Sequence, residues 1–193
     1  MKAVFAAIII LSVLGCASTP RVPLTFKEPV EAGSYKMHFS DNMSEASVTR
    51  ILAHIRNAQE KVPKLVFSAD FYVIHKYVGF RNQGFVMAGV ERSDDSLVLF
   101  ITPYFQRQNR NYQEAVIIHE MVHAKLFTLG LLDEEQCQID VHEHIAYSVS
   151  LPFNKDFDDR AAIKNQILSY ADKVAKCDMH KYGKFYQEFA EYM

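Results

Sequence analysis

The 193-residue chain lacks tryptophan, has almost no net charge and contains no apolar run long enough to span a membrane. Lys and Arg number 21 against 23 Asp and Glu. This slightly acidic balance differs from the basic charge expected of a nucleic-acid-binding domain. The missing tryptophan does not preclude a core, because there are 14 Phe and 10 Tyr. With 49% hydrophobic and 23% charged residues, the composition excludes disordered, collagen-like and coiled-coil chains. The length fits one domain.

The first residues have the pattern of an export signal. Lys2 precedes an apolar run of about 12 residues, whereas a membrane-spanning helix needs roughly 20. The run ends in Val-Leu-Gly-Cys at Cys16, with Ala17 next, which resembles a bacterial lipobox. The resemblance implies a lipoprotein signal peptide over residues 1–15 and lipidation of Cys16. Because Ala17 is not Asp, it also implies the outer membrane of the cell envelope, with the protein facing the periplasm. The alternative is an ordinary secretory signal with an incidental cysteine.

Three prolines follow the cysteine, with few apolar residues between them. We therefore expect residues 16–34 to form a lipid-anchored tether and residues 35–193 to form the folded domain. Two further cysteines, Cys137 and Cys177, remain in the mature chain. In an oxidising envelope they could form one disulfide, and the alternative is two unpaired buried thiols.

Hydrophobic periodicity divides the rest of the chain into strands and helices. A strand is expected near residues 65–74, and a β-hairpin at 85–90 and 97–101 around a polar turn. Helices are expected from an N-cap at Ser44 to Pro63, from Asn111 to Leu129, from Asp133 to Ser150, and in two segments beyond residue 158. This order predicts an α+β fold, with a small antiparallel sheet packed against several helices.

The second of these helices contains His119-Glu120-Met121-Val122-His123, an H-E-x-x-H pattern. The i, i+4 spacing places His119 and His123 on one helix face, where they can hold one zinc ion. Glu120 lies beside them, where it can take a proton from a water molecule that zinc has made more acidic. The alternative is a surface helix with two unrelated histidines.

A third zinc ligand is expected on the following helix. The short turn after Gly130 predicts a helical hairpin, in which residues 139–143 lie opposite the two histidines. The candidates in that helix are Glu134, Glu135, Asp140, His142, Glu143 and His144. The first two lie too near the turn.

Residues 97–151 resemble the core of a zincin metallopeptidase, in which a strand, an active-site helix and a second helix follow one another. Glu143, twenty residues after His123 and three before Ala146, is similar to the glutamate ligand of the gluzincin branch. The resemblance implies an α+β zincin-like fold and one Zn²⁺ ion held by His119, His123 and Glu143. Tyr147 departs from the pattern, because gluzincins often have Asp or Asn there to orient a zinc histidine.

His142 is the alternative third ligand, since it shares an apolar stripe with Ile145 and Val149. The segment from His119 to Ala124 also resembles SprT-like proteases, whose third ligand is a histidine. Those proteases place Gly and then an aromatic residue after that histidine, and Glu143 does not match.

The resemblance implies a zinc-dependent peptidase of the bacterial envelope, with Glu120 as general base and then general acid. Its partners would be a peptide or protein substrate and the membrane reached through the lipid anchor, without nucleic acid. The substrate would extend along an edge strand, either 97–101 or 85–90. An oxyanion stabiliser remains open among Tyr147, Tyr104, His75 and His180. The alternative function is a non-catalytic lipoprotein that binds a protein partner and has a structural or degenerate metal site.

Overall fold

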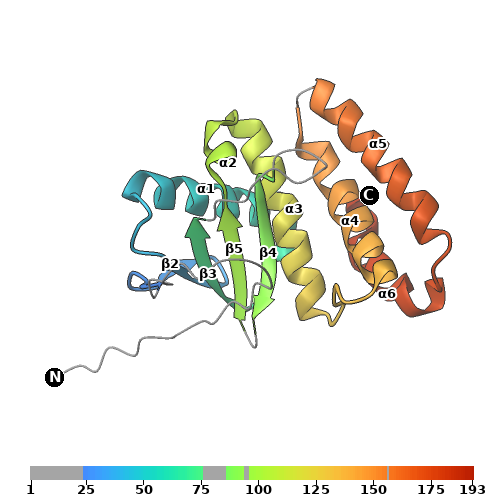
Figure 1. Cartoon of the computed structure of the whole chain (residues 1–193), viewed down its shortest axis with the longest axis horizontal. Helices are drawn as coiled ribbons and strands as arrows, with labels where there is room; N and C mark the ends of the chain where they lie inside the picture. Colours follow the sequence, from blue (N-terminus) through green and yellow to red (C-terminus); the bar gives the residue numbers. More distant parts are fainter. Residues whose placement is uncertain (1–23, 76–85, 94–95, 156) are drawn as a thin grey trace, which may run out of the picture.

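The computed structural model describes residues 24–75, 86–93, 96–155 and 157–193, which form a five-stranded sheet and six α-helices. The expected signal segment and Cys16 lie outside the described residues. Helix α3 (Arg110–Thr128) separates the sheet from the C-terminal helices (Figure 1). The strands are β1 (Val30–Ala32), β2 (Tyr35–Phe39), β3 (Ala69–His75), β4 (Ala88–Ser93) and β5 (Ser96–Ile101). The other helices are α1 (Glu45–Lys61), α2 (Pro103–Arg107), α4 (Gln136–Ser150), α5 (Phe157–Val174) and α6 (Met179–Phe189), with 3-10 turns at Pro63–Leu65, Leu151–Phe153 and Ala190–Tyr192.

The mixed α+β class is as predicted, but the prediction of an antiparallel sheet is wrong. The strand order is β1-β2-β3-β5-β4, and β3 pairs in parallel with both β2 and β5. Helix α1 connects β2 to β3, and such a crossover permits parallel pairing of successive strands. Only the two outer pairs, β1 with β2 and β4 with β5, are antiparallel.

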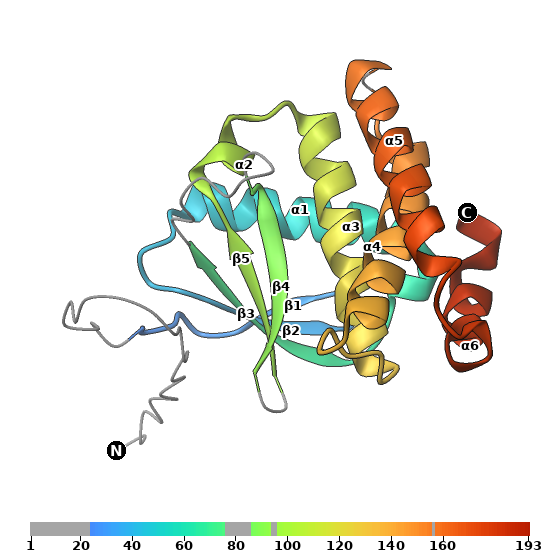
Figure 2. The same cartoon turned by 45° about the vertical axis from the view of Figure 1, so that its right-hand side comes forward.

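The predicted hairpin is confirmed, although β4 begins at Ala88 and continues to Ser93, beyond the expected end at residue 90. Strand β5 lies between β3 and β4, so the prediction that residues 97–101 could be an edge strand is wrong. Strand β4 is the edge of the described sheet next to α3 (Figure 2).

The main core lies between the sheet and helices α1 and α3. Strand residues Phe71, Val73 and Leu99 pack there against Ile55 of α1 and Met121 of α3. Alternate residues of β3 and β5 point to the other face, where a smaller cluster forms. This second cluster contains Ile74, Val98 and Phe100. Burial on both faces explains the nearly continuous apolar sequence of β5.

Helix boundaries follow from side-chain caps. Ser44 caps α1 as predicted, because its hydroxyl accepts from the Ser47 N–H at 3.2 Å. The predicted cap at Asn111 is wrong, since Asn109 accepts from the Tyr112 N–H and α3 starts two residues earlier. The carboxylate of Glu114 in α3 forms an ion pair with Lys61 of α1. Neither α2 nor the two first strands were predicted.

The folded part of the chain begins before the expected end of the tether. Strand β1 pairs with β2 through Val30–Ala32, and Phe26 forms a bridge with Ser40. Among the described residues, no helix combines the length and apolar character needed to cross a membrane.

Candidate metal centre

Helix α3 places His119 and His123 on the face that turns toward α4. Their ring centroids lie 4.7 Å apart, and both side chains are 13% exposed. The opposite faces of α3 are apolar and buried, with Ile117, Ile118 and Met121 in the core. The helix is therefore oriented by its core contacts, and the i, i+4 spacing then fixes the two imidazoles together.

The turn between α3 and α4 returns the chain so that the two helices lie side by side. Gly130 has φ +84°, which favours glycine, and its N–H donates to the Phe127 carbonyl at 3.0 Å. The Leu131 N–H donates to the Leu126 carbonyl, also at 3.0 Å. These two bonds form a Schellman motif, which ends α3 sharply and permits the hairpin.

Glu143 of α4 reaches the two histidines across this hairpin. The Nε2 atoms of His119 and His123 are 3.0 Å apart, and they lie 3.6 and 3.8 Å from the carboxylate oxygens of Glu143. A tetrahedral zinc with bonds of about 2.0–2.1 Å places its ligand atoms about 3.3 Å apart. Two imidazoles and one carboxylate at these separations fit a zinc ion after shifts of about half an ångström.

His142 has a different place from the one expected of a ligand. Its Nε2 is 2.9 Å from the Leu131 carbonyl oxygen, and its Nδ1 is 3.1 Å from Nδ1 of His123. Both ring nitrogens are therefore engaged away from the point where His119, His123 and Glu143 converge. Among the described His, Cys, Asp and Glu side chains, His119, His123 and Glu143 form the group that could hold a metal ion.

Glu120 is buried beside this group, at 7% exposure. Burial raises the pKa of Glu120 to about 7, with a contribution from the negative charge of Glu143, while His119 acts against the rise. The backbone of Val90 in β4 also forms a hydrogen bond with the carboxylate, which lowers its pKa. A carboxyl group with a pKa near neutrality can both accept and return a proton.

The charges of the three convergent side chains are coupled. Burial opposes ionisation of Glu143, but the close contact with His119 and the charges of the histidines hold its pKa at about 2. Burial lowers the pKa of His123 to about 3. Burial also acts against protonation of His119, yet Glu143, Glu120 and the Ala146 backbone together raise its pKa. Glu143 therefore stays ionised, and its negative charge favours a positive charge on His119. A bound metal ion could supply that positive charge in place of the proton on His119.

A cleft of about 560 Å³ opens in front of these residues. Residues Val86–Val90, which include the start of β4, form one wall, and helices α3 and α4 form the other. Of the four candidates for an oxyanion stabiliser, Tyr147 lines this cleft, with its ring centroid 4.4 Å from that of His119. His75 instead contacts Gln106, with 2.8 Å between their nitrogens.

Comparison with protein-family models, curated proteins and solved structures finds no match for this chain. The structure brings together His119, Glu120, His123 and Glu143, the residues that the sequence and its zincin resemblance indicate for one centre. The contacts of His142 and the backbone of Val90 leave no pattern in the sequence and could not be predicted from it.

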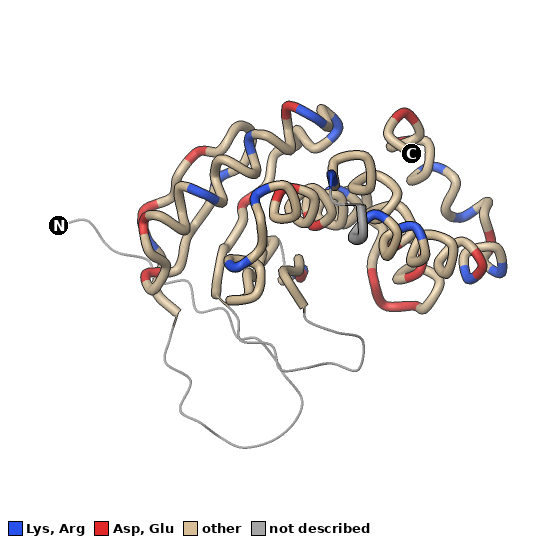
Figure 3. Tube along the Cα trace, turned by 90° about the horizontal axis from the view of Figure 1, so that it is seen from above, with Lys and Arg blue, Asp and Glu red and all other residues tan. Residues whose placement is uncertain are grey.

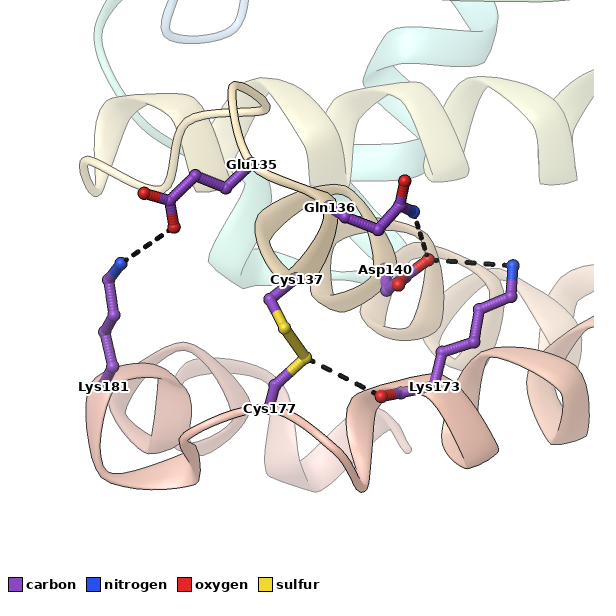
Figure 4. The surroundings of a disulfide bond; sticks show 7 residues. All are labelled: Glu135, Gln136, Cys137, Asp140, Lys173, Cys177 and Lys181. Atoms are coloured by element: carbon purple, nitrogen blue, oxygen red, sulfur yellow. Dashed lines mark hydrogen bonds and ion pairs between the residues drawn. A yellow bond between two sulfur atoms is a disulfide. The ribbon is translucent and has the colours of Figure 1, made fainter.

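A disulfide joins the first turn of α4 to the segment between α5 and α6. Cys137 and Cys177 form this bond, which settles the alternative left open by the sequence (Figure 4). Lys181 and Glu135, 3.2 Å apart, add an ion pair on one side of it, and Asp140 meets Lys173 at 3.7 Å on the other. Glu143 lies less than two turns beyond Cys137, so these links hold the helix that carries it.

Proposed function

We propose that the protein is a zinc-dependent peptidase with a zincin-like, gluzincin-type centre. The observation that supports this most is the convergence of His119, His123 and Glu143 within 4.8 Å, at a cleft that Glu120 also lines. Catalytic zinc uses three protein ligands and keeps one position open, whereas structural zinc is closed by four. The engagement of His142 with the Leu131 carbonyl favours the open arrangement. Zinc at this point would act as a Lewis acid toward the substrate carbonyl and would increase the acidity of water.

The exposed side of β4 offers backbone groups to an extended peptide. The Thr102 N–H donates to the Met87 carbonyl at 3.0 Å, so Met87 and Thr102 form a hydrogen-bonded pair. From there on, non-hydrogen-bonded and hydrogen-bonded residue pairs alternate along β4 and β5. In this alternation the N–H and C=O of Ala88 and Val90 point away from β5. The Val90 contact with Glu120 agrees with that direction. A substrate strand pairing with Ala88 would lie along the wall of the cleft, with affinity from its backbone and little sequence specificity.

Glu120 would move the proton in this reaction. Its carboxylate would accept a proton from the attacking water and return it to the amide nitrogen that leaves. The backbone of Val90 lies beside this carboxylate at the edge of β4, next to the place of the peptide. Tyr147 lines the same cleft and is the residue we assign to the developing negative charge on the substrate oxygen.

We also propose that the protein is anchored in the cell envelope. The lipobox-like sequence at Cys16 supports a lipid anchor in the cell envelope, on the periplasmic side of the outer membrane. A disulfide fits such an oxidising compartment. Lys and Arg are interleaved with Asp and Glu along the described chain (Figure 3), and the balance of charge does not favour nucleic acid as a partner.

Metal analysis and a Glu120→Gln variant test this function together. We expect about one zinc per chain in both proteins, and cleavage of an unfolded protein substrate only by the wild type. Equal cleavage by the variant would contradict the role of Glu120. Zinc binding without cleavage by either protein would favour the alternative, a lipoprotein that binds a partner and has a structural metal site. Wild type that binds no zinc when carefully purified would exclude the proposal.

A further inference from the structure

His142 is a buried histidine next to the candidate metal centre, and both of its ring nitrogens have partners. It is 2% exposed, and its ring is held between neighbours, with centroids 4.8 Å from Phe127 and 5.3 Å from His123. Its Nε2 faces the Leu131 carbonyl at 2.9 Å, and its Nδ1 faces Nδ1 of His123 at 3.1 Å. These contacts form a chain from a backbone carbonyl to one of the proposed zinc ligands.

The Leu131 carbonyl determines the direction of each hydrogen bond in this series. A carbonyl oxygen can only accept, so Nε2 of His142 must carry the proton that it donates to Leu131. A neutral imidazole has one N–H, so Nδ1 of His142 is an acceptor. It can bond to His123 only if Nδ1 of His123 carries the proton. Nε2 of His123 is then left with a lone pair, pointing toward Glu143 and His119.

The C-terminal cap of α3 fixes the position of Leu131, whose carbonyl begins this series of hydrogen bonds. Leu131 is 2% exposed, and its N–H bonds to the Leu126 carbonyl within the Schellman motif that Gly130 permits. The Leu131 carbonyl therefore has a fixed position at the end of α3.

We propose that His142 is a positioning residue that holds His123 in the Nδ1–H tautomer and so presents its Nε2 to the metal. The inference rests on the metal-binding part of the proposed function and does not require peptidase activity. Partners of this kind fix the ring orientation and the tautomer of a ligating histidine, and their loss typically weakens metal binding 10- to 100-fold. Here the partner is a second imidazole in place of the carboxylate or carbonyl that usually has this role.

The first test is the tautomeric state of the metal-free wild type. Long-range ¹H–¹⁵N NMR spectra of the histidine rings, recorded in a chelator, distinguish a protonated from an unprotonated ring nitrogen. We expect the proton of His123 on Nδ1 and that of His142 on Nε2. A proton on Nε2 of His123, or an even mixture of its tautomers, would overturn the proposal without any variant that could fail to fold.

The second test compares three variants of His142 by zinc competition with a chromophoric chelator. In His142→Asn, the amide oxygen can take the place of Nδ1 and accept from His123. In His142→Gln, the longer amide reaches toward Leu131 and leaves His123 without its acceptor, and His142→Leu removes both contacts. We expect zinc affinity to fall 10- to 100-fold in the Leu and Gln variants and to stay within about threefold of wild type in the Asn variant.

The pattern across these variants separates positioning from mere packing. Each folded variant is checked by circular dichroism and by its intact disulfide. Equal losses in the Asn and Leu variants, or a Leu variant with wild-type affinity, would contradict the proposal. The expected pattern in a protein that cleaves no peptide would support the role of His142 and refute only the proposed function.

Discussion

Replacing Glu120 with glutamine should stabilise the metal-free protein at alkaline pH. Burial raises the pKa of this carboxyl group from 4.5 to about 7, so the native state binds its proton more tightly than the unfolded state does. The free energy of unfolding therefore falls as the pH rises from 4.5 to 7, and the loss is complete above pH 7. At about 1.4 kcal/mol for each pH unit in this range, the ionised carboxylate costs about 3 kcal/mol.

The glutamine side chain resembles the protonated acid and can still accept from the Val90 N–H. Urea unfolding in a chelator, with the disulfide intact, should show the variant about 2–3 kcal/mol more stable than wild type at pH 8, and less than about 1 kcal/mol more stable at pH 5. Glu60→Gln, an exposed position on α1, is the matched control and should change stability by less than about 0.5 kcal/mol. The same gain at both pH values, or a loss at pH 8, would refute this account of Glu120.

Two further predictions concern the elements that hold the site. Reduction of the Cys137–Cys177 bond, whose cysteines are 40 residues apart, should lower the free energy of unfolding by about 4 kcal/mol, and a loss below about 1 kcal/mol in urea titrations with and without reductant would contradict this. Gly130→Ala should destabilise the protein by about 1 kcal/mol because of its positive φ, although a Cβ there meets no atom within 4 Å. Gly183 lies inside α6, and a Cβ there also meets no atom within 4 Å, so Gly183→Ala should stabilise the protein by about 0.5–1 kcal/mol. Midpoints of thermal unfolding that shift in the same direction in both variants would contradict the role of the positive φ at Gly130.

The parts of the site that depend on local spacing could be predicted from the sequence. His119 and His123 lie on one face of α3 because a helix repeats every 3.6 residues, and Gly130 marked the end of that helix. The antiparallel hairpin, which requires only a short turn, predicted that residues 139–143 lie opposite the two histidines, and the gluzincin resemblance then implied Glu143 as the ligand. The sequence predicted Asn111 as the start of α3, but Asn109, two residues earlier, has the same side chain and accepts from the Tyr112 N–H.

The parts that depend on contacts between distant segments could not be predicted. Strand β2 was missed, and its parallel pairing with β3 joins residues more than thirty positions apart. The contacts of His142 depend on the Leu131 carbonyl, a backbone group that every residue has. A stripe shared with Ile145 correctly indicated that His142 is buried, but burial alone does not distinguish a ligand from the partner of a ligand.

We propose that His119, His123 and Glu143 hold one zinc ion and leave it a position open to the cleft. Crystals of the protein with one equivalent of zinc, with an anomalous difference map at the zinc edge, test it most directly. We expect a single peak about 2.0–2.1 Å from Nε2 of both histidines and about 2.0–2.2 Å from a Glu143 oxygen, with His142 still bonded to Leu131. A peak bonded to His142, or zinc bound elsewhere, would contradict the account.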